Sequence, residues 1–426
     1  MVRTIVLLGP PGSGRSTLLK ALLTSAEVDG GGSADHAAWA TSPLAAATVV
    51  ASLSVHGVRL TLLNPRTSGT VDLAPRAALS GADAAVFVVS AVAGLDHATR
   101  LLWQECEAIE MPRVIVLTHV DDPRADPDEA LEACQEQLGE GLGIHALHLP
   151  MLGDDGSVAG LIDLVRLRIA DHAHGDRRVR PAEQEHVDLV EDERTQIVEA
   201  ILAEAEDDDL LPRFVAGEEL DADVLASQMH AAISRGHLHP VLVSAITPAG
   251  CGAAELAEVM AQGSAPLTSS RLPMVTSPRG EPRDPLSCAP DAVLCAGVLG
   301  LIADPSDPPL AIVRMFSGTL HADSAVTLSR QGAPAEVEVR QVRMIHLPLG
   351  ARLHRVDWAV AGDIALVAGL SGVRPGDTLS SPDNPLLLEE PAPPPTTLAE
   401  PVAPPSRDRS QHRMLPIVDV QARPRD

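Results

Sequence analysis

The sequence is poor in aromatic and lysine residues. It has three tryptophans, three phenylalanines and no tyrosine among 426 residues. Proteins that hold single-stranded nucleic acid stack its bases on aromatic side chains, so this composition argues against that class. Lys20 is the only lysine, and the other basic residues are arginines. The formal net charge of −26 also argues against a protein that coats nucleic acid by neutralising phosphates.

Cysteines and long apolar runs are scarce as well. The five cysteines are scattered without a CxxC pair, so neither a zinc ribbon nor a disulfide framework is indicated. No apolar run approaches the roughly 20 residues of a membrane-spanning helix, and the run after Met1 is too short for a signal peptide. We therefore expect a cytoplasmic protein with no membrane partner. Its length and its 45% apolar content predict a globular chain of two or three domains.

Strands and helices alternate in the first 263 residues, which predicts an α/β domain with a mostly parallel sheet covered on both faces. Expected strands lie at 4–8, 84–90, 113–118 and 241–243, and a hairpin at 47–55 and 58–63. Expected helices lie at 16–24, 95–109, 127–138 and 253–262. Residues from about 150 to 240 interrupt this order with a strand at 158–168 and helical stretches at 181–210 and 221–235. We expect an inserted α/β subdomain there.

The second half of the chain changes in character. Residues 264–290 are rich in proline and serine, which predicts a linker. Short alternating runs over 291–388 predict a β-barrel, with strands at 310–316, 325–329, 335–345 and 363–368. Residues 389–426 contain frequent prolines without periodicity, which predicts a disordered tail.

The strongest motif is a glycine-rich turn between the first strand and the first helix. It reads Gly9-Pro10-Pro11-Gly12-Ser13-Gly14-Arg15-Ser16-Thr17, the phosphate-loop pattern with arginine in place of the usual lysine. Glycines let backbone N–H groups turn toward phosphate oxygens, and the helix N-terminus adds positive potential. We expect these residues to bind nucleotide and Ser16 to be a magnesium ligand. The alternatives are a turn with no ligand, or phosphate binding shifted by the planar, forked guanidinium of Arg15.

A second motif, Thr118-His119-Val120-Asp121, ends the strand at 113–118. It is similar to the element that reads guanine in GTP-binding proteins, where an aspartate accepts hydrogen bonds from the base's N1 and exocyclic amine. The ring of His119 could cover a face of the base in place of the usual lysine. An aspartate after a strand is also a common turn former or helix cap. Ser244 and Ala245, after the strand at 241–243, fit a third base-contacting element.

Longer stretches, collinear from about residue 2 to 390, carry a family pattern. They include Leu102–Cys106 with Met111–Val114, 158–165, 210–220, Arg314–Leu320, Ala361–Ile364 and Gly376–Leu379. With the phosphate loop, these stretches resemble elongation factor G and its actinobacterial elongation-factor-G-like relatives. The resemblance implies a translational GTPase with guanine nucleotide and Mg²⁺ as cofactors and the ribosome as a partner. The acidic charge leads us to expect no direct DNA binding.

Several positions depart from that family. Its DxxG element corresponds to Asn64-Pro65-Arg66-Thr67, and its water-orienting histidine to Ser68. The magnesium-binding threonine of the first switch is at best displaced to Thr48, after the stretch 43–47. Phosphoryl transfer depends on positioning water and metal. We therefore identify no catalytic residue and expect GTP hydrolysis to be weak or lost.

The sequence leads to one main hypothesis and several alternatives. The main hypothesis is a guanine-nucleotide-binding, elongation-factor-G-like factor at the ribosome. Elongation factor G continues with three further domains after its barrel, so we expect no competence for translocation. The leading alternative is a nucleotide-free pseudo-GTPase scaffold that acts through protein contacts. Two further alternatives stay open. Arg15 could act as a charge clamp that supports GTP hydrolysis, or the chain could be a decaying paralogue without function.

Overall fold

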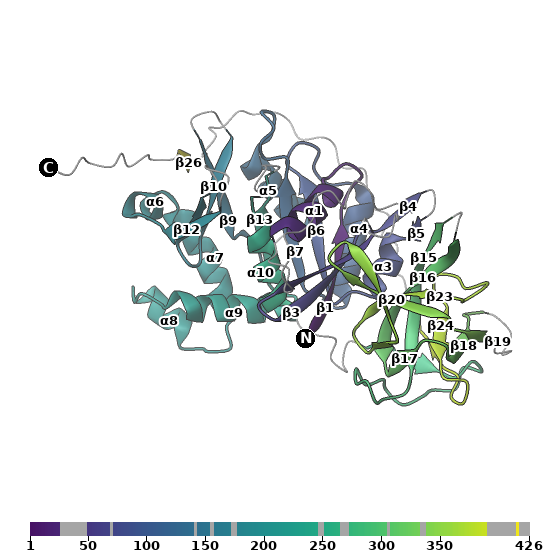
Figure 1. Ribbon diagram of the computed structural model, residues 1–426. Coiled ribbons are helices and arrows are strands. Elements are labelled where there is room, and N and C mark those ends of the chain that lie inside the picture. The colour runs from purple at the N-terminus through teal and green to yellow at the C-terminus, as the bar shows by residue number, and fades with distance from the viewer. Residues whose placement is uncertain are drawn as a thin grey trace. The chain divides into compact units, whose positions relative to one another are not determined.

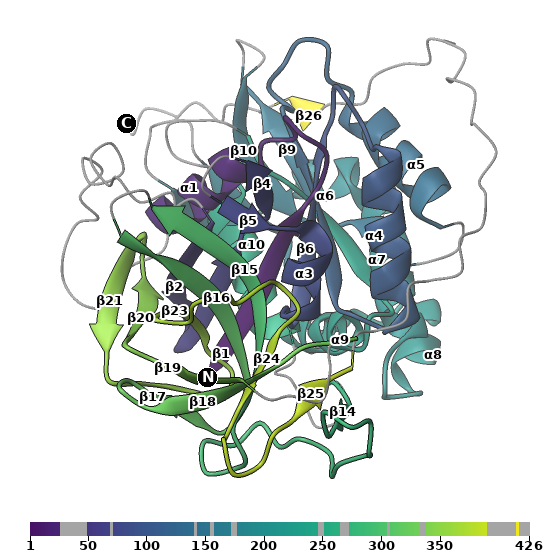
Figure 2. The same ribbon diagram turned by 90° about the vertical axis from the view of Figure 1, so that its right-hand side faces the viewer.

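A computed structural model describes most of the chain (Figures 1 and 2). The described residues are 1–25, 49–68, 71–139, 143–153, 157–171, 177–245, 251–264, 272–304, 307–332, 338–389 and 415–416. The chain divides into two compact units. The first comprises Met1–Leu8, Arg15–Val86 and Ala257–Pro394, and the second Gly9–Gly14, Phe87–Leu256 and Pro395–Asp426. Outside residues 415–416, the tail expected to be disordered lies beyond the described residues after Glu389.

The first unit begins with an α/β arrangement of strands and helices. Strand β1 (Val2–Leu8) pairs in parallel with β3 (Val58–Leu63), and β3 pairs antiparallel with β2 (Val50–Val55). The expected hairpin at 47–55 and 58–63 is therefore confirmed. Helix α1 (Arg15–Ser25) buries Leu18, Leu19, Leu22 and Leu23, whose spacing places them on one face. Helix α3 (Pro75–Ser80) follows a short β-hairpin described below.

The second unit contains parallel strands with accompanying helices. Strand β13 (His239–Val243) pairs in parallel with β7 (Arg113–Thr118) and with β8 (Ile144–Ala146). Strand β6 (Ala84–Ser90) crosses the division between the units and is buried along its whole length, as a strand covered on both faces should be. The accompanying helices are α4 (His97–Ala108), α5 (Pro127–Leu138) and α10 (Ala253–Gly263). The strand at 113–118 and the helix at 127–138 match their predictions.

The expected insertion has its own antiparallel sheet and a group of helices (Figure 1). Its strands are β9 (His148–Leu152), β10 (Val158–Asp163), β11 (Arg168–Asp171) and β12 (Arg178–Pro181), and β26 (Leu415–Pro416) pairs with β9. Its helices are α6 (Gln184–Leu189), α7 (Glu191–Ala203), α8 (Leu210–Val215) and α9 (Ala222–Arg235). The prediction of one strand over 158–168 is wrong. The Asp163 carboxylate accepts the backbone N–H groups of Val165 and Arg166 at 2.8 and 2.9 Å, which turns the chain.

The barrel belongs to the first unit, and its strands curve around one apolar core (Figure 2). Neighbouring strands pair antiparallel in the order β19-β18-β24-β15-β16-β23-β20-β21. Their bounds are Glu338–Gln341, Ala325–Ser329, Thr378–Ser380, Cys295–Asp304, Asp307–Ser317, Ile364–Ala368, Met344–Leu349 and Arg352–Val356. The run expected at 335–345 is divided between β19 and β20.

Two short strand pairs complete the unit. Strands β17 (Thr319–His321) and β22 (Trp358–Val360) pair antiparallel, as do β14 (Val275–Thr276) and β25 (Leu387–Leu388). The second pair includes part of the segment interpreted as a linker.

Buried charges join the barrel to β1 within the first unit. Arg314 of β16 and Asp83 each have 1% of the side chain exposed, and Arg314 Nη2 lies 2.8 Å from Asp83 Oδ1. The other Asp83 oxygen accepts the backbone N–H of Thr4 at 2.6 Å. Arg314 also contacts the Thr4 hydroxyl. Because both charges are paired and hydrogen-bonded, they tolerate burial that would otherwise be costly.

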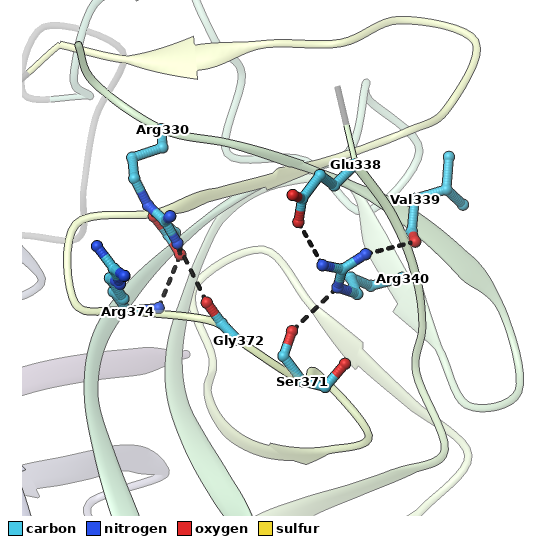
Figure 3. Close-up of polar contacts among 8 residues, drawn as sticks. Arg330, Glu338, Val339, Arg340, Ser371, Gly372 and Arg374 are labelled. Carbon is cyan, nitrogen blue, oxygen red and sulfur yellow. Dashed lines mark hydrogen bonds and ion pairs between the residues drawn. The ribbon is translucent and has the colours of Figure 1, made fainter. Parts of the chain in front are cut away.

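Two arginines hold the barrel loop at 371–377 (Figure 3). Arg340 Nε donates to the Ser371 carbonyl at 3.0 Å. The guanidinium of Arg330 makes two 2.7 Å hydrogen bonds to the carboxylate of Asp377, which is 1% exposed. Such fork-to-carboxylate pairs are among the stronger hydrogen bonds in proteins. Asp377 therefore stabilises the loop that leads into β24.

Candidate functional site

The loop Gly9–Gly14 has the backbone conformation that a phosphate loop needs. Gly9, Gly12 and Gly14 have φ values of 143°, 83° and 89°, which side chains rarely tolerate. A Cβ on Gly9 would lie 2.2 Å from the carbonyl oxygen of Val88, so only glycine fits there. The side chain of Ser13 is buried, and within the described part of the chain its Oγ has no hydrogen-bond partner.

Thr118 and His119 lie against this loop, at the end of β7. Thr118 Oγ1 donates to the Ser13 carbonyl at 2.7 Å and is within 3.2 Å of Val89 O and His119 Nδ1. A Cβ placed on Gly14 would lie 3.5 Å from both Thr118 Oγ1 and His119 Cε1, so the imidazole ring lies beside the loop backbone. The structure therefore brings two sequence motifs together that are about a hundred residues apart.

Asp121 lies in a tight turn just after these residues. The N–H of Asp122 donates to the His119 carbonyl at 3.1 Å, which closes the turn, and the side chain of Asp121 is exposed. Asp122 binds Arg124 through both carboxylate oxygens, at 2.9 and 2.7 Å. The hydrogen bonds from Arg124 lower the pKa of Asp122 to about 2. Asp122 therefore shapes the turn, while Asp121 presents its carboxylate to solvent.

Ser244 and Ala245 follow the neighbouring strand β13. The Ser244 N–H donates to the Leu117 carbonyl at 2.8 Å, and the Ala245 N–H donates to the Cys251 carbonyl at 3.2 Å. The carboxyl ends of β7 and β13 are adjacent in this unit, and ligands of open α/β sheets bind outside such strand ends. The expected base-contacting residues thus lie at adjacent strand ends.

Arg15, Ser16 and Thr17 continue the chain into α1 of the first unit. There the Ser16 hydroxyl accepts a hydrogen bond from Asn64 Nδ2 at 3.2 Å. Arg15 Nη1 donates to the Pro65 carbonyl at 3.3 Å. Ser16 and Thr17 are exposed, whereas Asn64 is 3% exposed. The residue in place of the family's magnesium-linked aspartate thus contacts the expected magnesium ligand itself.

The segment after Asn64 forms a β-hairpin, not an open switch loop. Strand β4 (Arg66–Ser68) pairs with β5 (Val71–Leu73), and β5 pairs with β15 of the barrel in the same unit. Sequence reasoning recognised Asn64 only as a departure from a motif and missed its contact with Ser16. The available signal was a polar residue at the end of a buried strand. Thr48 and the stretch 43–47 lie outside the described residues.

Among the residues described, no group of three or more histidine, cysteine or acidic side chains could hold a metal ion. Within the same part of the chain, no helix combines the length and the hydropathy needed to cross a bilayer.

A phosphate-loop α/β domain followed by an antiparallel barrel is the class that this fold defines. Family comparison agrees: residues 71–265 match the elongation factor Tu GTP binding domain, and residues 294–382 match elongation factor G domain 2. The first match begins after the phosphate loop.

Individual proteins of similar sequence and structure define the family within this class more closely. The elongation factor G-like protein of Mycobacterium tuberculosis is 34% identical over 95% of this chain and 57% of its own length. Elongation factor G 2 of Geobacter metallireducens is 29% identical over 80% of this chain and 48% of its own. A crystal structure from Thermus thermophilus is 27% identical, with a TM-score of 0.65, over 94% of this chain and 57% of its own. The chain belongs to the elongation-factor-G-like proteins of the translational GTPase family. It spans about half the length of these relatives.

Proposed function

We propose that this protein binds guanine nucleotides and hydrolyses GTP weakly or not at all. The observation that carries the binding is the 2.7 Å hydrogen bond from Thr118 Oγ1 to the Ser13 carbonyl. It ties the strand end that precedes Asp121 to the loop that would receive phosphate. Base recognition and phosphate binding would then occur at a fixed separation, as one bound nucleotide requires.

Asp121 would select the base. Its exposed carboxylate can accept two hydrogen bonds, which matches the N1–H and exocyclic amine of guanine and does not match adenine. The turn that carries it is held by the Asp122–Arg124 pair. His119, beside Gly14, would cover the ring where the family has lysine.

Weak hydrolysis follows from the residues after β3. Asn64 replaces an aspartate, Pro65 has no N–H to offer, and Ser68 stands at the position of the water-orienting histidine. The following strand β5 is also paired with β15, which restrains the segment. Catalysis of phosphoryl transfer is almost entirely positioning and electrostatic stabilisation, so these changes remove most of it.

The wider role would be that of a ribosome-associated factor, because the family acts in translation. The alternative is a pseudo-GTPase scaffold. It is favoured by the contact of Arg15 with the Pro65 carbonyl, which directs a cation of the loop to the protein's own backbone.

Calorimetric titration with GDP, GTP and ATP tests the proposal. We expect affinities on the order of micromolar for GDP and GTP and no heat with ATP. Asp121→Ala should weaken GDP binding at least about tenfold, because it removes two hydrogen bonds to a charged acceptor. Glu132→Ala, which removes an exposed carboxylate of α5, is the control and should retain the wild-type affinity.

A second measurement addresses hydrolysis and the alternative. Phosphate release with saturating ribosomes and GTP should not exceed the ribosome background. Folded protein that binds no nucleotide would refute the proposal and favour the scaffold. Recovery of binding by Arg15→Lys would then show that the rest of the pocket is intact.

A further inference from the structure

The magnesium ion that the family implies does not fit the residues at Ser16. A magnesium ligand presents an oxygen lone pair to the ion, and Mg²⁺ demands nearly octahedral oxygen ligands at 2.0–2.1 Å. The Ser16 oxygen instead accepts an amide hydrogen of Asn64 at 3.2 Å. An amide hydrogen carries partial positive charge, so it opposes a cation at the place where a carboxylate would attract one.

Burial and the surrounding backbone restrain Asn64 in this position. Its side chain is 3% exposed, and its backbone N–H donates to the Val49 carbonyl at 2.8 Å. The residue that follows is Pro65, whose ring restricts the preceding backbone to an extended conformation. The amide therefore belongs to the ordered end of β3 and not to a movable loop.

The next acidic residue along the chain does not take over the missing role. The first acidic residue after β3 in the sequence is Asp72, and it lies in β5 opposite Leu301 of β15 with its side chain exposed. The backbones approach closely there, since a Cβ on Gly300 would lie 2.4 Å from the Asp72 carbonyl oxygen. The pairing with the barrel therefore fixes Asp72 within a sheet.

The chain supplies a different source of positive charge. Arg15 carries a permanent charge and five N–H donors in a planar fork, which suits phosphate oxygens and can engage backbone and phosphate together. The exposed first turn of α1 adds further N–H groups. An arginine and an asparagine replace the lysine and the aspartate of the usual site, so positive charge is kept while the carboxylate that recruits metal is lost.

We propose that this site binds the phosphates of a guanosine diphosphate without a divalent cation. The inference rests on the proposed function, since it concerns the same nucleotide. Asn64 makes the site metal-independent: its amide both positions the Ser16 hydroxyl and disfavours Mg²⁺. An aspartate at position 64 would restore the need for the ion, because its charge would repel phosphate until a cation lies between them.

The test is a titration of the full chain with GDP, once with millimolar Mg²⁺ and once with EDTA. The wild-type dissociation constant should differ by less than about threefold between the two buffers. Asn64→Asp should bind GDP at least about tenfold more weakly in EDTA, and Mg²⁺ should restore most of this loss. Asn384→Asp, at the only other asparagine of the chain, is the matched control and should behave as the wild type.

The outcomes separate the two proposals. Wild-type binding that improves tenfold or more with Mg²⁺ overturns metal independence while nucleotide binding stands. Failure to bind GDP in either buffer overturns both nucleotide binding and metal independence. The wild-type comparison does not depend on any variant, so a poorly folded Asn64→Asp, detected by circular dichroism, leaves the test decisive.

Discussion

Mild acid should destabilise this protein through two buried histidines, of which His239 is the more strongly perturbed. Its side chain is 1% exposed, and its Nε2 lies 3.1 Å from Nη2 of the buried Arg113. Its ring packs edge-on against Trp103, with the ring centroids 5.1 Å apart. Burial first, and the charge of Arg113 second, lower the pKa of His239 from 6.5 to about 3.

The direction in which stability changes with pH follows from proton uptake. Because the folded pKa lies below the unfolded value, only the unfolded state takes up the proton between pH 6.5 and about 3. The free energy of unfolding should therefore fall by about 1.4 kcal/mol per histidine for each pH unit below 6.5. Burial lowers the pKa of His230 to about 4, so it behaves in the same way. At pH 5 the two together should remove about 4 kcal/mol, a large part of a typical total stability.

Urea unfolding followed by circular dichroism at several pH values between 7.5 and 5 measures this loss. His239→Gln keeps a polar side chain opposite Arg113 but does not titrate, so it should reduce the slope between pH 6.5 and 5 by about 1.4 kcal/mol per pH unit. The exposed His97→Gln, in the same unit, should keep the wild-type slope. A slope unchanged by His239→Gln would refute the assignment to this residue.

Three further predictions concern burial and backbone. Arg314→Ala should cost about 3–5 kcal/mol in thermal unfolding because it removes the arginine that pairs with the buried Asp83 carboxylate, whereas Arg314→Met with Asp83→Leu should cost less; an equal loss in both variants would contradict this reasoning. Gly252→Ala should cost about 2 kcal/mol or more in urea unfolding, because φ is +87° and its Cβ would lie 1.9 Å from the Val243 carbonyl oxygen. Iodoacetamide on native protein should modify Cys288, the exposed cysteine, well before Cys106, whose pKa burial raises to about 12, and mass spectrometry after digestion would show the order.

Local patterns in the sequence determined the elements and the phosphate loop. Apolar runs bounded by glycine, proline or aspartate predicted β7 and α5 at their observed bounds, because hydrophobic periodicity and end signals act over a few residues. The glycine spacing predicted the loop, and three of its glycines have positive φ. Parallel strand ends meet at one edge of a sheet, so Thr118 and Ser244 could be expected near each other.

Only the tertiary structure decided how distant residues meet. Asn64 reaches Ser16 across 48 positions, and Arg314 reaches Asp83 across 231. The pairing of β5 with β15 was likewise invisible, since nothing in three residues of strand indicates their partner. The physical reason is the same in each case: a hydrogen bond or ion pair depends on where folding brings the chain, and side-chain identity alone does not specify that position. Among these contacts, that of Asn64 with Ser16 carries the proposed loss of the metal.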